Sequence, residues 1–170
     1  MEKEWWNRKN FADNALKQNK ELFEVLSFYL LNCPVMIKKR KVSQRAKTFE
    51  DKGIQGASLS KFLSAMKKSC SNQVVWELCT DDVDIINKSE QQQNNTNEFL
   101  FFIENTEIRQ TRSIFYYIRN SLAHGAFSVV KEQRTNVFYF ECSNKGKTKA
   151  RMKVYATTLL VWIRLFENFN

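Results

Sequence analysis

Apolar residues repeat at helical spacing along much of the 170-residue chain. In residues 2–32 they recur at intervals of three and four positions, which predicts one long amphipathic helix. Pro34 marks its end, because the residue before a proline disfavours helical backbone angles. Residues 58–68 show the same spacing and are predicted to form a second helix. A third is expected to begin near residue 73 and to run into the acidic stretch at residues 80–84.

The second half of the chain carries a stronger pattern. Residues 98–124 have apolar positions at helical spacing and are interpreted as a long helix that stops at Gly125. Residues 127–130 and 137–142 are rich in β-formers and predict two short strands joined by a turn. Residues 143–148 are expected to form a polar loop. The apolar segment 149–168 predicts a last helix, buried against the core or a second subunit.

The composition favours helices over an all-β fold, because an all-β fold needs many turns and the chain has only four glycines and one proline to form them. We therefore predict a mainly α fold, a helical bundle with a small β-hairpin before the last helix. The length fits one domain, residues 1–170. The glutamine- and asparagine-rich residues 88–97 are expected to form an exposed, mobile connector inside it.

The net charge of +9 favours anionic partners such as RNA, although a solvated basic surface is the alternative. Lys38, Lys39 and Arg40 belong to a basic run that either contacts an RNA backbone or forms a solvated loop. The four cysteines show no C-x-x-C spacing, so we expect buried, reduced thiols and no metal site or other cofactor. The start of the chain does not resemble a signal peptide, and the apolar runs are too short to span a bilayer. A cytoplasmic protein without membrane contact is expected.

The segment R-N-S-L-A-H-G at residues 119–125 holds the candidate chemistry. His124 is the only histidine of the chain. Histidine is the side chain whose unperturbed pKa lies nearest neutrality, so His124 is the natural candidate for proton transfer. The alternative is a histidine that caps its own helix, with Arg119 in a surface ion pair.

This segment resembles the motif of the HEPN superfamily, the higher eukaryotes and prokaryotes nucleotide-binding domains. Arg119, four intervening residues and His124 match the family pattern R-x(4–6)-H, and Asn120 matches the polar residue that often follows the arginine. The family motif also lies near the end of a long helix, and an apolar helix follows it. The resemblance covers about residues 98–168. It implies a helical bundle that cuts RNA without a metal, with a composite site between two subunits.

The resemblance also implies roles for individual residues. His124 would act as acid or base, with a second His124 from another subunit in the other role, and Arg119 would neutralise the phosphoryl oxygens. Asn120 would orient Arg119 or bind phosphate. Arg112 either helps to hold phosphate or pairs with a glutamate of its own helix. Tyr116 either stacks on a base or belongs to the core. The products would be a 2′,3′-cyclic phosphate and a 5′-OH.

Three functions are compatible with these features. The first is a metal-independent endoribonuclease, a toxin or defence protein in the manner of many HEPN proteins, with a neutralising antitoxin as a possible partner. The second is a non-catalytic module that binds RNA or nucleotides through its basic surface. The third is a structural dimerisation domain built on the apolar last helix. Cleavage of RNA, binding of intact RNA and dimerisation without RNA affinity distinguish the three.

Overall fold

The computed structural model describes residues 19–35, 47–70, 74–92, 95, 97–132 and 134–169. These residues contain both helices and strands. The elements are α2 (Lys20–Leu31), α3 (Ala57–Ser69), β1 (Val75–Leu78), α4 (Asp82–Gln92), β2 (Phe99–Phe102), α5 (Arg109–Ala123), β3 (Phe127–Glu132), β4 (Thr135–Asn144), β5 (Lys147–Tyr155) and α6 (Ala156–Asn168).

The strands form one five-stranded mixed sheet in the order β1-β2-β5-β4-β3. Strands β1 and β2 are parallel and are joined through α4, as a parallel pair requires a crossover connection. Strands β3, β4 and β5 form an antiparallel meander, and β5 also pairs antiparallel with β2. The β4–β5 turn has Lys145 and Gly146 at φ 51° and 74°, the positive angles that a tight two-residue hairpin requires.

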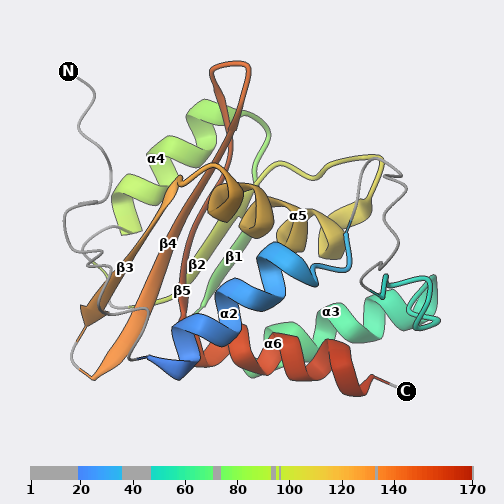
Figure 1. The fold of residues 1–170 in the computed structure, drawn as a ribbon. Helices are drawn as coiled ribbons and strands as arrows, with labels where there is room; N and C mark the ends of the chain where they lie inside the picture. Colours follow the sequence, from blue (N-terminus) through green and yellow to red (C-terminus); the bar gives the residue numbers. More distant parts are fainter. Residues whose placement is uncertain are drawn as a thin grey trace.

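The helices cover the two faces of the sheet unequally (Figure 1). Helices α5 and α6 pack on one face, and α2 and α3 lie outside them. Among the helices in the described residues, α4 is the one that packs on the other face, against β2 and β5. The larger core therefore lies between the sheet and the four helices, and it includes α5, whose end carries the HEPN-like motif.

Strand β2 is buried on both of its faces. Leu100 and Phe102 contribute to the large core beneath α5 and α6, whereas Phe99 and Phe101 contribute to the smaller core beneath α4. All four side chains are at most 1% exposed. A strand covered on both faces has no polar side, so its sequence is a continuous apolar run.

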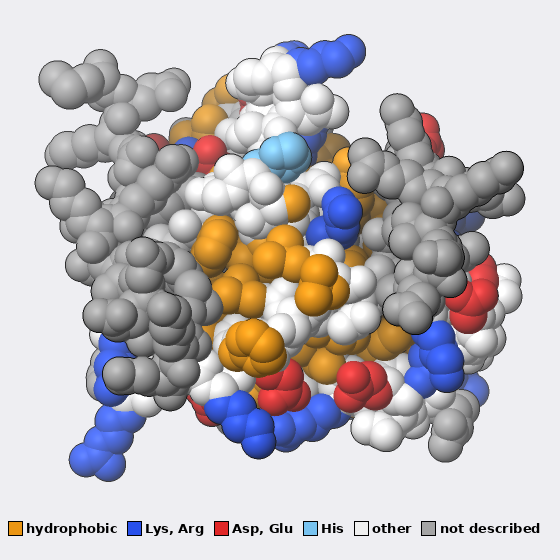
Figure 2. Space-filling model, in the orientation of Figure 1, with side chains coloured by type: hydrophobic (Ala, Val, Ile, Leu, Met, Phe, Trp, Pro, Cys, Tyr) orange, Lys and Arg blue, Asp and Glu red, His pale blue; other side chains and the backbone are white. Residues whose placement is uncertain are grey.

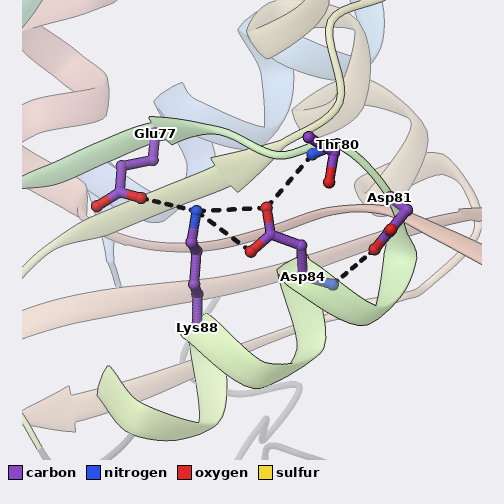
Figure 3. A network of polar contacts seen from close by, with 5 residues as sticks. All are labelled: Glu77, Thr80, Asp81, Asp84 and Lys88. Atoms are coloured by element: carbon purple, nitrogen blue, oxygen red, sulfur yellow. Dashed lines mark hydrogen bonds and ion pairs between the residues drawn. The ribbon is translucent and has the colours of Figure 1, made fainter.

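Polar contacts fasten α4 to the end of β1 (Figure 3). The Asp81 side chain accepts a hydrogen bond from the Asp84 backbone N–H at 2.8 Å, which caps the start of the helix. The Lys88 ammonium lies 2.8 Å from Glu77 Oε2 and 3.2 Å from Asp84 Oδ1. The acidic residues at 81–84 thus serve as a helix cap and as ion-pair partners on the surface.

The prediction of a mainly α bundle is wrong, because a five-stranded mixed sheet runs through the middle of the domain. Three strands lie at least partly where helices were expected: β1 within residues 73–84, β2 within residues 98–124, and β5, of which residues 149–155 fall in the segment 149–168. A short apolar run such as β2 does not alternate, and periodicity alone cannot separate it from a buried helix segment.

Strand β5 does carry a readable signal. Its small or apolar residues Thr148, Ala150, Met152 and Val154 are buried and alternate with four basic residues. The strand passes directly into α6, so no polar loop separates the two patterns. One of the basic residues, Lys153, is only 2% exposed, and its ammonium lies 2.9 Å from Glu132 Oε2.

Residues 88–92 belong to α4 and do not form the predicted connector. Ser89 is fully buried, and its hydroxyl accepts a hydrogen bond from Arg151 Nη1 at 3.2 Å. A glutamine-rich composition therefore did not prevent a helix that packs on the sheet. The first part of the predicted helix 2–32 lies outside the described residues, and its second part is α2.

Other predictions are confirmed. Helix α3 covers residues 58–68, α5 ends where Gly125 follows, and the two predicted strands correspond to β3 and β4. All four cysteines are buried free thiols. No helix in the described part of the chain combines the length and the apolar character needed to cross a bilayer.

Candidate functional site

The end of α5 has a defined geometry. The helix closes with a Schellman arrangement, in which Ala126 N donates to Ser121 O at 2.8 Å and Gly125 N donates to Leu122 O at 3.2 Å. Gly125 has φ 67°, a left-handed angle that glycine adopts without strain. His124 is the last residue before this turn, and its backbone N–H donates to Asn120 O at 3.0 Å.

A cavity of about 520 Å³ opens beside this helix end. Its wall combines the end of α5, the connection from β2 to α5, and the β4–β5 hairpin. The lining residues are Ile103, Glu104, Asn105, Thr106, Tyr116, Tyr117, Asn120, His124, Ala126, Glu141, Cys142, Ser143, Asn144 and Lys149. Such a volume and such a mixture of polar and aromatic groups are typical of a site for a small ligand or part of a larger one.

The three motif residues lie around this cavity in different ways. His124 is exposed and lines it, and Asn120 is half-buried and also lines it. Arg119 is half-buried outside the wall, but its Nη1 donates to Asn120 Oδ1 at 3.3 Å. Asn120 therefore connects the guanidinium to the cavity.

Arg119 also acts on a residue that follows helix α2. The positive charge of Arg119 acts on the Cys33 thiol, just beyond the end of α2, and opposes the effect of burial there. Burial nevertheless dominates and raises the pKa of Cys33 to about 12. Arg119 is thus close enough to Cys33 to act on it electrostatically, and it is connected to the cavity through Asn120.

Of the other predicted site residues, Tyr116 lies at the cavity and Arg112 does not. Tyr116 lines the cavity and is half-buried. Arg112 instead forms an ion pair with Glu50, with 2.7 Å between Nη1 and Oε1, and its guanidinium lies over the ring of Phe49. The partner of Arg112 comes from another segment and not from its own helix. Lys38, Lys39 and Arg40 lie outside the described residues.

The sequence analysis missed the other wall of the cavity. Glu104 and Asn105 follow β2, whereas Glu141 and Lys149 lie on β4 and β5. The backbone N–H of Ile103 donates to Lys149 O at 3.0 Å, which brings the two segments together. The prediction of a polar loop at residues 143–148 is wrong, because all of them except Lys145 and Gly146 belong to β4 and β5. No local pattern marks Glu104 or Lys149.

The charged side chains on this wall differ in whether they form ion pairs. The Glu141 carboxylate is engaged by Arg151, whose Nε lies 2.8 Å from Oε2. For Lys149 and Glu104, no ion pair is found within the described ranges. The cavity therefore offers one ammonium and one carboxylate to a ligand, beside the imidazole of His124.

Cys142 also lines the cavity but is poorly suited to nucleophilic chemistry. Burial raises the pKa of its thiol to about 11, although a hydrogen bond with the Asn120 side chain acts in the opposite direction. A thiol with so high a pKa holds little thiolate near neutral pH, and the thiolate is the reactive form. Cys142 is therefore a weaker candidate for chemistry in this cavity than His124 is.

The cavity therefore lies at a helix end and has His124 of the R-x(4–6)-H motif, together with the adjacent Asn120, in its wall. The chain matches the family model described as HEPN pEK499 p136 over residues 6–169 and belongs to this family. The match extends well beyond residues 98–168, where the sequence motif pointed. No curated protein and no solved structure is significantly similar to the chain.

Proposed function

We propose that this protein is an endoribonuclease that cleaves RNA at the cavity beside α5. The observation that carries the proposal is the placement of His124 and Asn120 in one polar cavity with Lys149, in a member of the HEPN family. The imidazole supplies proton transfer and the ammonium attracts a phosphodiester. HEPN domains are often ribonucleases, and the toxin or defence role suggested by the resemblance is part of the proposal.

The reaction uses the 2′-OH of RNA as the nucleophile. A base removes the proton of the 2′-OH, the 2′-oxygen forms a bond to the adjacent phosphorus, and the bond from phosphorus to the 5′-oxygen breaks. An acid donates a proton to the departing 5′-oxygen, so the products are a 2′,3′-cyclic phosphate and a 5′-OH. His124 serves in one of these two proton transfers.

Cations and amides around His124 stabilise the developing charge. Lys149 lines the cavity and neutralises a non-bridging phosphoryl oxygen. Arg119 adds positive charge from the edge of α5, and Asn120 holds the guanidinium through its Oδ1. Asn120 is thus a positioning residue whose amide also faces the substrate.

The wild-type protein provides the first test of this function. We expect it to cleave single-stranded RNA in the presence of EDTA and to leave DNA intact, because DNA lacks the 2′-OH. Mass spectrometry of the fragments should find 2′,3′-cyclic phosphate ends. RNA that is bound in a salt-dependent way and recovered uncut would instead identify a non-catalytic binding module.

A second copy of the chain completes the proposed site. Each chain has one histidine, whereas the reaction needs both an acid and a base. Helix α2 presents apolar side chains to solvent, with Phe23 66% and Leu31 76% exposed. Figure 2 shows apolar side chains gathered over α2 and α5, with the pale blue histidine above them. We therefore propose a homodimer that buries this surface and brings two imidazoles to one cleft.

Substitution on α2 should dissociate this dimer. Phe23→Ser combined with Leu31→Ser is expected to convert a dimer to a monomer in analytical ultracentrifugation, because the change removes apolar area from the contact. The matched control is Leu78→Ser with Val83→Ser, two exposed apolar residues on β1 and α4. A wild-type protein that sediments as a monomer at high concentration would refute the homodimer.

A further inference from the structure

One side of the cavity holds groups that the proposed cleavage does not use. Glu104 and Asn105 lie in the connection between β2 and α5, and Tyr116 lies on the second turn of α5. Proton transfer and charge neutralisation come from His124, Lys149 and Arg119. The carboxylate, the amide and the phenol ring on this side therefore need a separate explanation.

The connection is held in a fixed shape by Asn105. Its carbonyl oxygen accepts hydrogen bonds from Ile108 N at 3.1 Å and Arg109 N at 3.0 Å, and its N–H donates to Ser113 Oγ at 2.9 Å. Its Oδ1 accepts a hydrogen bond from Glu107 N at 3.0 Å. This arrangement orients the Asn105 amide and leaves its NH₂ group as a donor toward a ligand.

The aromatic part of this wall is equally constrained. Tyr116 packs beside Tyr117, with ring centroids 5.5 Å apart. The Tyr117 hydroxyl donates to Ile103 O at 2.8 Å, one residue before Glu104. The ring of Tyr116 and the carboxylate of Glu104 thus belong to one supported wall. A planar base can stack on such a ring, as bases of single-stranded RNA do on aromatic side chains.

We propose that this wall selects guanine beside the scissile phosphate, a specificity that rests on the proposed ribonuclease function. Guanine presents two neighbouring N–H donors on its Watson–Crick edge, N1–H and N2–H, which match the two oxygens of the Glu104 carboxylate. Its O6 is an acceptor for the Asn105 amide. Tyr116 stacks on the face of the base.

The other bases match this wall less well. Uracil has one donor, N3–H, between two carbonyl oxygens that repel a carboxylate. Adenine and cytosine each offer one exocyclic amino group beside a ring nitrogen that is an acceptor. Among the four bases, only guanine pairs both carboxylate oxygens without placing an acceptor against them.

Mapping of cleavage positions tests this specificity. On RNA with randomised sequence, the wild-type protein is expected to cut next to guanine about tenfold more often than next to other bases. Glu104→Gln replaces one acceptor oxygen by an NH₂ donor and should bring the ratio of cuts next to guanine to cuts next to other bases down to about one. Glu107→Gln, an exposed glutamate of the same connection that does not line the cavity, should keep the preference.

A binding measurement separates the two proposals. Calorimetric titration with 3′-GMP and 3′-UMP should give tighter binding of 3′-GMP to the wild-type protein and equal binding to Glu104→Gln. Cleavage with no base preference would overturn guanine selection and leave the ribonuclease standing. Absence of any cleavage, together with selective binding of 3′-GMP, would reject the ribonuclease and support the guanine pocket. Equal binding of both nucleotides would overturn the pocket whether or not RNA is cut.

Discussion

His124→Ala is expected to reduce the rate of RNA cleavage by at least about 100-fold, because general acid–base catalysis contributes a factor of about 10² to 10⁴. The side chain is exposed at the end of α5, so its removal opens no hole in the core. The fold should remain, with a free energy of unfolding within about 0.5 kcal/mol of the wild type. Single-turnover cleavage of a fluorescent RNA measures the rate, and urea denaturation measures the stability.

The matched control for this variant removes a cation elsewhere on the surface. Arg134→Ala lies at the exposed β3–β4 turn, away from the cavity. It should lower RNA affinity slightly, through the loss of one positive charge, and leave the cleavage step unchanged. Undiminished cleavage by His124→Ala would remove the imidazole from the mechanism and leave no proposed role for the cavity in proton transfer.

Phe115→Ala is expected to cause the largest loss of stability, about 3–5 kcal/mol. Phe115 is fully buried on α5 and lies at the centre of an aromatic cluster. Its ring centroid is 5.3 Å from Phe49, 5.6 Å from Tyr29 and 6.2 Å from Phe62. Truncation leaves a cavity where α5 meets α2 and the segment before α3. For a chain of this size the melting temperature should fall by roughly 10 °C.

Val83→Ala is the control for this core substitution. Val83 is 59% exposed on α4, on the other side of the sheet, and its truncation should cost less than about 0.5 kcal/mol. Urea denaturation of both variants compares the two sites directly. A loss below 1 kcal/mol in Phe115→Ala would mean that this ring does not organise the core beneath the motif helix.

Local chemistry was sufficient to predict several features. The end of α5 followed from the apolar spacing and from Gly125, whose left-handed backbone closes the helix. His124 was chosen from its residue type, whereas the roles expected of Asn120 and Arg119 come from the resemblance to the HEPN superfamily and stay predictions. Helix α3 was predictable from its helical spacing of apolar residues. The β3–β4 hairpin was predictable from its β-forming residues and the polar turn between them, although β4 contributes to the cores on both faces of the sheet.

The mixed sheet could not be predicted in the same way. Strand β2 is covered on both faces, so its four apolar residues carry no period that distinguishes a strand from a helix. Ser89 shows the opposite case. It is a polar residue of a low-complexity stretch, yet it is fully buried, and Arg151 of β5 donates a hydrogen bond to its hydroxyl. In both places, partners distant in sequence decided the outcome.

The sequence by itself determined one wall of the candidate site, and only the tertiary structure supplied the other. A local pattern can place His124 and Asn120 on one helix end, because the backbone geometry there depends on neighbours within a few residues. Glu104 and Lys149 are far apart in the chain. They line the same cavity because β2 pairs with β5 and the backbone N–H of Ile103 donates a hydrogen bond to Lys149 O. Hydrophobic patterning shows that a segment is buried, but the pairing of strands decides which polar groups border its ends.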